Sequence, residues 1–343
     1  MSENKKRIIQ FDALRVIAAF AVVLLHTSAQ RYYESFPSAE WDARNLYDSI
    51  VRWAVPIFIM ISGAFFLDSN KRINIKSLFS KYITRLLFIY VFWSIVYYVY
   101  IFWGKMSLFT LTTELIKGPY HFWFLKTLIG LYILVPLLRV IAADIKIERY
   151  FLALSIVVAF VVPMFLPFLS DFSTNLVKEQ LPLYLMNTLS CYVCYFVLGH
   201  YLRNTVIKKN IKTVIYIFGI LSIVAVCVLT KMLSQRDGEP NYIFYKAYNL
   251  FTLLEAVALF IFVKDIKISP KYHQFIINAS KISLGIYILH PFVMFLLSDF
   301  FQFNSASFNP LYFIPVYALL LFVLSFIATY VLIRIPILRK LVT

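Results

Sequence analysis

The chain consists of long apolar runs separated by short polar loops. Ten runs of about 20 residues lie at 8–28, 48–67, 82–103, 122–141, 150–169, 184–202, 212–232, 243–263, 275–298 and 312–334. Each is long enough for a membrane-crossing helix, and none alternates as a membrane strand does. The pattern predicts an all-α, polytopic bundle of about ten transmembrane helices, forming one membrane domain over residues 1–343. The longest loop, at about 29–47, is too short for a soluble domain.

The basic residues predict how this bundle is oriented. With the N-terminus in the cytoplasm, 22 Lys and Arg lie in or beside inner loops and 10 in or beside outer loops. Cytoplasmic loops of membrane proteins carry such an excess, so we expect both termini in the cytoplasm. The same bias accounts for the net charge of +16, and the sequence contains no nucleic-acid-binding motif.

Composition agrees with a membrane protein, and the cysteines suggest no metal site. The chain is 61% hydrophobic and 15% charged, whereas soluble proteins are roughly 45–50% apolar and 25% charged. The first run contains Asp12 and Arg15 and has no small-residue cleavage site, so we expect a retained helix rather than a signal peptide. The three cysteines, at Cys191, Cys194 and Cys227, lie in apolar runs and are expected to pack as small hydrophobes.

The first run also contains the strongest functional candidates. Ionisable side chains are costly in a membrane segment and usually serve a function. Arg15 and His26 are eleven residues apart, which places them on one helix face roughly 16 Å apart along its axis. Asp12 precedes Arg15 by three residues and is expected to pair with it. One face of the helix therefore carries a charged pair near its inner end and an imidazole, suited to general-base chemistry at neutral pH, near its outer end.

Further polar and aromatic residues share the predicted outer half with His26: Arg52, His121, Trp123, Lys126, Tyr287 and His290. Each also has an ordinary structural explanation, since histidines pack against carbonyls, tryptophans line membrane interfaces and long cations reach lipid headgroups. Arg85 and Arg139 lie in the inner half, where basic residues are expected from topology alone. Glu255 lies near mid-membrane and is expected to pair with a buried arginine.

Five sequence motifs resemble, in order, those of the acyltransferase family 3 membrane proteins. The resemblance covers nearly the whole chain: FDALR-x10-H from Phe11 to His26, VPIFIMISGAFF from Val55 to Phe66, HFWFLKTLIGLYILVPLLR from His121 to Arg139, YFVLGHYL from Tyr195 to Leu202 and SLGIYILHPF from Ser283 to Phe292. The second and third are most similar to the branch that contains enterobacterial common antigen acetyltransferase and the membrane part of a serine racemase. Many members also have an R-x-x-R motif, of which Arg52-x-x-Val55 keeps only the first arginine.

The resemblance implies an acyl-CoA-dependent O-acyltransferase of the bacterial cytoplasmic membrane. An acetyl or other short acyl group would pass from cytoplasmic acetyl-CoA or another acyl-CoA to a hydroxyl of a cell-envelope glycan or lipid-linked sugar outside. His26 and Arg15 match the residues that the family is considered to require. The catalytic candidates are His26 and Asp12. Candidates for binding the acyl donor are Arg15, Arg52 and Arg85. Candidates for binding the acceptor are His121, Trp123, Lys126, Tyr287 and His290.

Two other functions remain open at this stage. Some relatives are proposed to transport serine or to flip polysaccharide, which would require substrate passage without acyl-CoA. A binding or scaffold protein is the third alternative, although intact Arg15 and His26 argue against it. No fused hydrolase-like or racemase domain is expected, and a homo-oligomer is one of the assemblies that the sequence allows.

Overall fold

The computed structural model describes residues 7–71, 73–165 and 181–342, with only the backbone described for 165 and 181–190. These residues form helices joined by loops, with no strand among them. The helices are α1 (Ile9–Ala29), α2 (Ala39–Ile50), α3 (Ala54–Phe66), α4 (Ile75–Ser77), α5 (Thr84–Ile101), α6 (Leu108–Lys117), α7 (Trp123–Ala143), α8 (Ile145–Ile156), α9 (Val162–Phe165), α11 (Leu181–Asn204), α12 (Lys209–Asp237), α13 (Leu250–Asp265), α14 (His273–Lys281), α15 (Ser283–Phe301), α16 (Pro310–Leu332) and α17 (Pro336–Val342). Short π-helical or 3-10 segments join several of them, among them η2 (Tyr120–Phe122) and η5 (Ile243–Tyr245).

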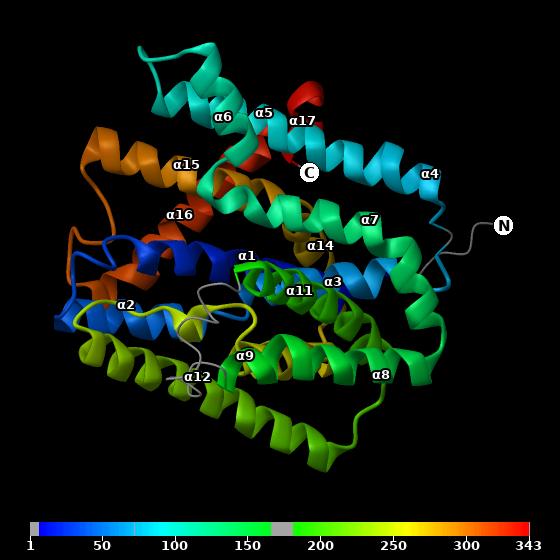
Figure 1. The fold of residues 1–343 in the computed structure, drawn as a ribbon. Helices are drawn as coiled ribbons and strands as arrows, with labels where there is room; N and C mark the ends of the chain where they lie inside the picture. Colours follow the sequence, from blue (N-terminus) through cyan, green and yellow to red (C-terminus); the bar gives the residue numbers. More distant parts are fainter. Residues whose placement is uncertain (1–6, 72, 166–180, 343) are drawn as a thin grey trace.

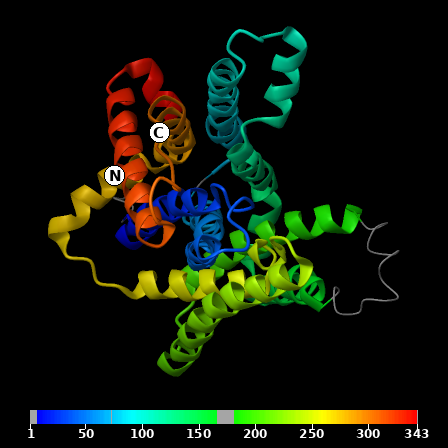
Figure 2. The same ribbon diagram turned by 90° about the vertical axis from the view of Figure 1, so that its left-hand side faces the viewer.

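Helix α1 lies at the centre of this bundle. Figure 1 shows it running between the other helices, and the view in Figure 2 shows them arranged around it. It contacts α2, α3, α13, α14, α15 and α16. Many of its apolar side chains are therefore buried, as Leu14, Ala18 and Val23 are. A side chain on α1 is held in place by neighbours from both halves of the chain.

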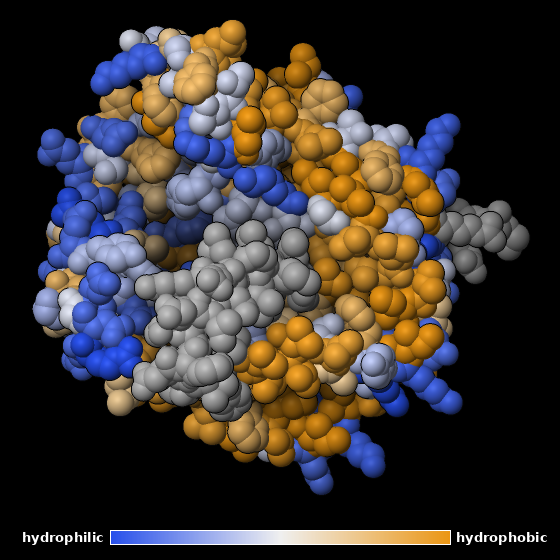
Figure 3. Space-filling model, in the orientation of Figure 1, coloured by the Kyte–Doolittle hydropathy of each residue, from blue (hydrophilic) through white to orange (hydrophobic). Residues whose placement is uncertain are grey.

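The predicted membrane fold is confirmed. Eight stretches of the described chain are long and apolar enough to cross a membrane, and they match eight of the ten predicted runs: Ile9–Ala29, Ala39–Phe66, Ile75–Ile101, Tyr120–Ala143, Lys209–Asp237, Ile243–Asp265, Ser283–Phe301 and Pro310–Leu332. Of the other two runs, 184–202 lies within α11, and 150–169 lies partly outside the described residues, with its described part helical. Apolar residues cover much of the face in Figure 3, and polar residues gather toward the ends of the bundle. The cytoplasmic position of both termini stays a prediction.

The segment predicted as the longest loop, at about 29–47, is only partly a loop, because it contains most of α2. The Ser38 hydroxyl accepts a hydrogen bond from the Trp41 amide at 3.3 Å and so begins the helix. Glu40 and Asp42 in the first turn complement the helix dipole. Arg44 is fully buried, and its guanidinium donates to the Gln30 carbonyl at 2.6 Å. Helix α2 therefore packs inward and leads almost directly into α3.

Helices α3 and α11 approach each other closely at two glycines. A Cβ atom on Gly63 would lie 1.7 Å from the carbonyl oxygen of Phe196, and one on Gly199 would lie 1.9 Å from that of Met60. Any side chain at either position would collide with backbone, so glycine is required at both. Small residues allow membrane helices to pack at such short range. This contact fixes α11 against α3 beside α1.

Two arginines stabilise the predicted inner end of α3. The Arg139 guanidinium donates to the carbonyls of Phe66, Asp68 and Lys71 at 2.9, 2.8 and 2.6 Å. Arg203 donates to the Ala64 carbonyl at 2.5 Å and pairs with the Asp68 carboxylate at 2.9 Å. The last carbonyls of a helix lack helical partners, and cations there satisfy them and the helix dipole. Arg139 and Arg203 therefore serve the fold.

Glu255, in α13, makes no direct ion pair with an arginine among the described residues, although the charge of Arg52 acts on it. Its side chain is buried, and neither carboxylate oxygen has a hydrogen-bond partner among the described residues. Arg52 forms its ion pair with Asp48 instead. A direct pair with Glu255 does not form because Asp48 lies one helical turn before Arg52 and reaches its guanidinium directly.

Candidate active site

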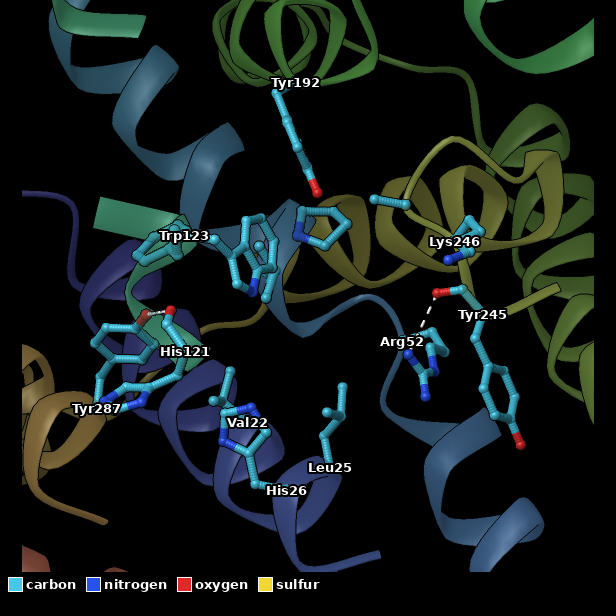
Figure 4. Close-up of a pocket in the computed structure, with 14 residues that line it drawn as sticks. Val22, Leu25, His26, Arg52, His121, Trp123, Tyr192, Tyr245, Lys246 and Tyr287 are labelled. Carbon is cyan, nitrogen blue, oxygen red and sulfur yellow. Dashed lines mark hydrogen bonds between the residues drawn. The ribbon is translucent and has the colours of Figure 1, made fainter. Parts of the chain in front are cut away.

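A cavity of about 270 Å³ lies between α1, α3, α7, α11 and α15, at the predicted outer end of the bundle. Its size is near the lower end of the ~300–1,000 Å³ typical of small-molecule sites. Figure 4 shows His26, His121 and Tyr287 on one side and Arg52, Tyr245 and Lys246 on the other. These side chains come from segments far apart in the sequence, so the fold brings them together.

Three histidines meet at one side of the cavity. The ring centroid of His26 lies 4.9 Å from that of His290 and 6.4 Å from that of His121, and His121 and His290 are 6.0 Å apart. His26 comes from the end of α1, His121 from η2 and His290 from the middle of α15. His26 and His121 line the cavity, and His290 lies behind His26.

The hydrogen bonds of His290 determine which nitrogen of His26 is available. His290 Nδ1 lies 3.0 Å from the Ile286 carbonyl oxygen, which can only accept, so this nitrogen carries the proton. In the neutral ring His290 Nε2 is therefore an acceptor, and His26 Nδ1, 2.6 Å away, donates to it. His26 then keeps a lone pair on Nε2, which has no hydrogen-bond partner among the described residues. The arrangement leaves His26 Nε2 free to take a proton.

His121 is buried, and its ring makes no hydrogen bond of normal geometry with a described residue, although the Ile288 backbone lies close enough to act on it. The residue is 1% exposed, and neither Nδ1 nor Nε2 has a hydrogen-bond partner among the described residues. Its backbone is anchored, because its carbonyl accepts from the Tyr287 hydroxyl. A neutral imidazole always has one N–H donor, and leaving it unpaired when buried costs roughly 1–3 kcal/mol. An oxygen atom of a ligand beside His26 would satisfy it.

The remaining walls are aromatic and cationic. Trp123 and Tyr192 pack with ring centroids 5.7 Å apart and planes inclined by 30°. Arg52 pairs with Asp48, donates to the Tyr245 carbonyl at 3.3 Å and lies 3.8 Å from the centroid of the Tyr245 ring. Flat aromatic surface and fixed cations are suited to a ring-shaped polar ligand.

Comparison with protein families identifies the chain. A family model described as an acyltransferase domain matches residues 8–334, nearly the whole sequence. The chain belongs to acyltransferase family 3. Comparisons with curated proteins and with solved structures found no match. Family membership and the apolar helices make the protein a multi-pass membrane acyltransferase.

Six of the residues predicted for this acyltransferase meet at the cavity. Five line it or its rim, and His290 is hydrogen-bonded to one of them: His26, Arg52, His121, Trp123, Tyr287 and His290. The sequence did not point to Tyr192, Tyr245 and Lys246, which also line it. Tyr245 and Lys246 lie at the outer end of a predicted helix, whereas Tyr192 lies near the middle of one, and no motif marks any of the three. No group of His, Cys, Asp or Glu in the described part of the chain is arranged to hold a metal ion.

The other four predicted residues of this acyltransferase lie outside the cavity. Asp12 is fourteen residues before His26, roughly 21 Å along α1, so it cannot exchange a proton with His26 directly. Arg15 and Arg85 both lie near enough to Tyr132, on α7, to act on it electrostatically. The Lys126 ammonium donates to the Lys117 carbonyl at 2.9 Å.

The predicted ion pair between Asp12 and Arg15 was wrong. Asp12 pairs with Arg7 through two contacts of 2.5 and 2.7 Å and accepts from the Ser280 hydroxyl at 2.7 Å. The prediction failed because the Asp12 carboxylate is held by Arg7 and by Ser280 of α14, so that Asp12 acts on Arg15 only through its charge. The burial of Asp12 and these bonds hold the predicted inner end of α1 in place. Arg7 lies outside the membrane-spanning segment, and its pKa is raised because its guanidinium donates to the Asp12 carboxylate.

Proposed function

We propose that this acyltransferase moves an acetyl or other short acyl group from cytoplasmic acyl-CoA to a hydroxyl of a cell-envelope glycan or lipid-linked sugar at the outer face. His26 is the general base of this proposal. The observation that carries it is the hydrogen-bond chain from His26 through His290 to the Ile286 carbonyl, which leaves His26 Nε2 unprotonated at the cavity. A base within reach of the acceptor hydroxyl is what acyl transfer to an alcohol needs.

The proposed reaction is an acyl substitution at the thioester. His26 Nε2 takes the hydroxyl proton as the acceptor oxygen forms a bond to the thioester carbonyl carbon. The carbon–sulfur bond then breaks, and His26 returns the proton to the departing thiolate, so that ester and thiol leave. His290 is a positioning residue here, because its Nε2 accepts from His26 Nδ1 throughout and touches no reacting atom.

His121 is suited to stabilise the charge that develops during this reaction. The thioester oxygen becomes an oxyanion when the acceptor attacks, and a fixed N–H donor in a buried site stabilises such charge strongly. The unpaired, buried imidazole of His121 lies beside His26 and provides that donor. The Tyr287 hydroxyl on its carbonyl holds its backbone in position.

The inner end of α1 supports entry of the donor from the cytoplasm. Arg15 forms no ion pair or hydrogen bond with a described residue, because Asp12 is taken by Arg7 and Ser280. An arginine without a carboxylate partner is a good ligand for phosphate. Arg15 and Arg85 beside Tyr132 are therefore assigned to the phosphates of acyl-CoA. The roughly 16 Å from Arg15 to His26 is then spanned by the extended acyl-bearing arm of the donor.

The experiment is label transfer by the purified protein. Radiolabelled acetyl-CoA and a cell-envelope extract are incubated with wild type, His26→Ala and His273→Ala. His273 is a matched control, since this histidine contacts the Ile268 carbonyl and lies outside the cavity. We expect transfer with wild type and His273→Ala, and loss of about 10²–10⁴-fold with His26→Ala, the usual contribution of a general base.

Label transfer that does not depend on His26, or none with several acyl donors, contradicts the proposal. Substrate uptake into vesicles without acyl-CoA would then identify a transporter. Thermal unfolding of each variant shows whether the substituted protein is folded.

A further inference from the structure

The cavity has an unbalanced charge on the side opposite the histidines. Two of its lining residues, Arg52 and Lys246, are cationic, and no Asp or Glu among the described residues lines it. Asp48, which pairs with Arg52, is not part of the lining. A ligand in this cavity therefore meets no carboxylate in the lining, although Arg52 is already paired with Asp48 from behind.

Arg52 and Lys246 differ in whether their charged groups already have partners within the protein. Arg52 is held by Asp48, by the Tyr245 carbonyl at 3.3 Å and by the face of the Tyr245 ring. Lys246 follows Tyr245 in the chain and is exposed at the cavity rim, and its ammonium has no hydrogen bond or ion pair with a described residue. Lys246 is thus the uncompensated cation, and Arg52 fixes the backbone that carries it.

The residues suited to the reaction and the residue suited to binding an anion lie on opposite sides of the cavity. His26 and His121 on one side are suited to the reacting hydroxyl and carbonyl, and Lys246 lies on the other (Figure 4). Trp123 and Tyr192 form a flat apolar surface that also lines the cavity. Sugar rings present apolar faces that pack on such surfaces, while their polar substituents point sideways.

We propose that the acceptor is an anionic sugar, whose carboxylate or phosphate binds Lys246 while its ring packs on Trp123 and Tyr192 and its hydroxyl faces His26. This inference rests on the proposed function and specifies its substrate class. A strongly hydrated ammonium binds carboxylate and phosphate alike, so either group on the sugar would satisfy this subsite.

Competition between matched sugars tests this inference. The His26-dependent labelling of a cell-envelope extract is measured with methyl glucoside, methyl glucuronide, glucose 1-phosphate or inorganic phosphate as competitor. We expect the glucuronide or the sugar phosphate to inhibit at about tenfold lower concentration than the neutral glucoside, since a charge-assisted hydrogen bond is worth about that factor. Inhibition by inorganic phosphate as strong as by the sugar phosphate would show that the sugar ring is not recognised, and would overturn the proposal.

Variants at Lys246 assign the preference to this residue. Lys246→Gln should remove the difference between charged and neutral sugars, and Lys246→Arg should keep it. Lys105→Gln is the matched control, because Lys105 is an exposed lysine of a predicted outer loop away from the cavity. A preference that persists in Lys246→Gln, or equal inhibition by all sugars with wild type, overturns the inference.

Direct binding separates failure of this inference from failure of the proposed function. The same sugars are added to the detergent-solubilised protein, and the midpoint of thermal unfolding is recorded without acyl-CoA. Stabilisation by anionic sugars that is lost in Lys246→Gln supports the anion subsite even if no label is transferred. Label transfer without any anion preference in either assay supports the transferase and refutes the subsite.

Discussion

Replacement of His290 is the sharpest test of the proposed base, because His290 touches no reacting group. His290→Leu removes the acceptor for His26 Nδ1, now 2.6 Å away. That hydrogen bond is worth about 1.5 kcal/mol, or about tenfold in the population of the reactive His26 tautomer. Loss of ring orientation adds to it, and the total lies within the ~10²–10⁴-fold that a general base contributes. We expect kcat to fall about 100-fold, with the KM for both substrates within about twofold.

A second variant at this position separates positioning from packing. The side-chain oxygen of His290→Gln can accept from His26 Nδ1 at nearly the same place, so we expect it to recover at least tenfold in kcat over His290→Leu. The assay is label transfer under saturating acyl-CoA, with thermal unfolding as the check on folding. Wild-type kcat in His290→Leu would refute the tautomer argument, as would equal losses in both variants.

Two further predictions concern the packing of the bundle and the donor site. Gly63→Ala should prevent stable folding, because its Cβ would lie 1.7 Å from the Phe196 carbonyl oxygen, whereas Gly130→Ala, with nothing within 4 Å, should be neutral or stabilising by up to about 1 kcal/mol. Thermal unfolding of both measures this, and equal midpoints would disprove the close contact. Arg15→Lys should weaken acyl-CoA binding about tenfold and leave acceptor binding unchanged, because lysine loses the fork geometry. Equal affinity for CoA in Arg15→Lys and wild type would refute the donor assignment.

The parts of the fold that could be predicted are those that depend on one helix at a time. Hydropathy locates the membrane helices because each must bury about 20 apolar residues, whatever surrounds it. Depth follows from position along each helix, which is why His26, His121 and His290 were expected at the same level. Depth and family motifs pointed to these three residues, but the sequence could not show that they meet, because that depends on how α1, η2 and α15 pack against one another.

The parts that escaped prediction depend on how helices are rotated against each other. Asp12 was expected to pair within α1, but Ser280 of α14 and Arg7 lie on the side it faces. Helix α2 was not predicted because its buried face includes the charged residues Arg44 and Asp48. Charged residues in such a segment suggest a loop unless their buried partners are known. Tyr192 and Lys246 carry no motif of their own, and only the packing of α11 and η5 brings them to His26.

The two ends of α1 differ in a way that constrains the proposed reaction. At the predicted inner end, the Asp12 carboxylate is hydrogen-bonded by Arg7 and Ser280. At the predicted outer end, His26 Nε2 has no hydrogen-bond partner among the described residues. Contacts with six other helices hold α1 along its length, so a shift of His26 toward the N-terminal end of α1 would disrupt much of the core. The base is therefore stationary, and the acyl group must travel to it. This requires a donor that extends roughly 16 Å beyond Arg15, a length that a short thioester without the CoA arm does not have. Under the proposed function, truncated acyl thioesters should consequently lose kcat as well as affinity, and equal kcat with acetyl-CoA and a truncated thioester would contradict a stationary base.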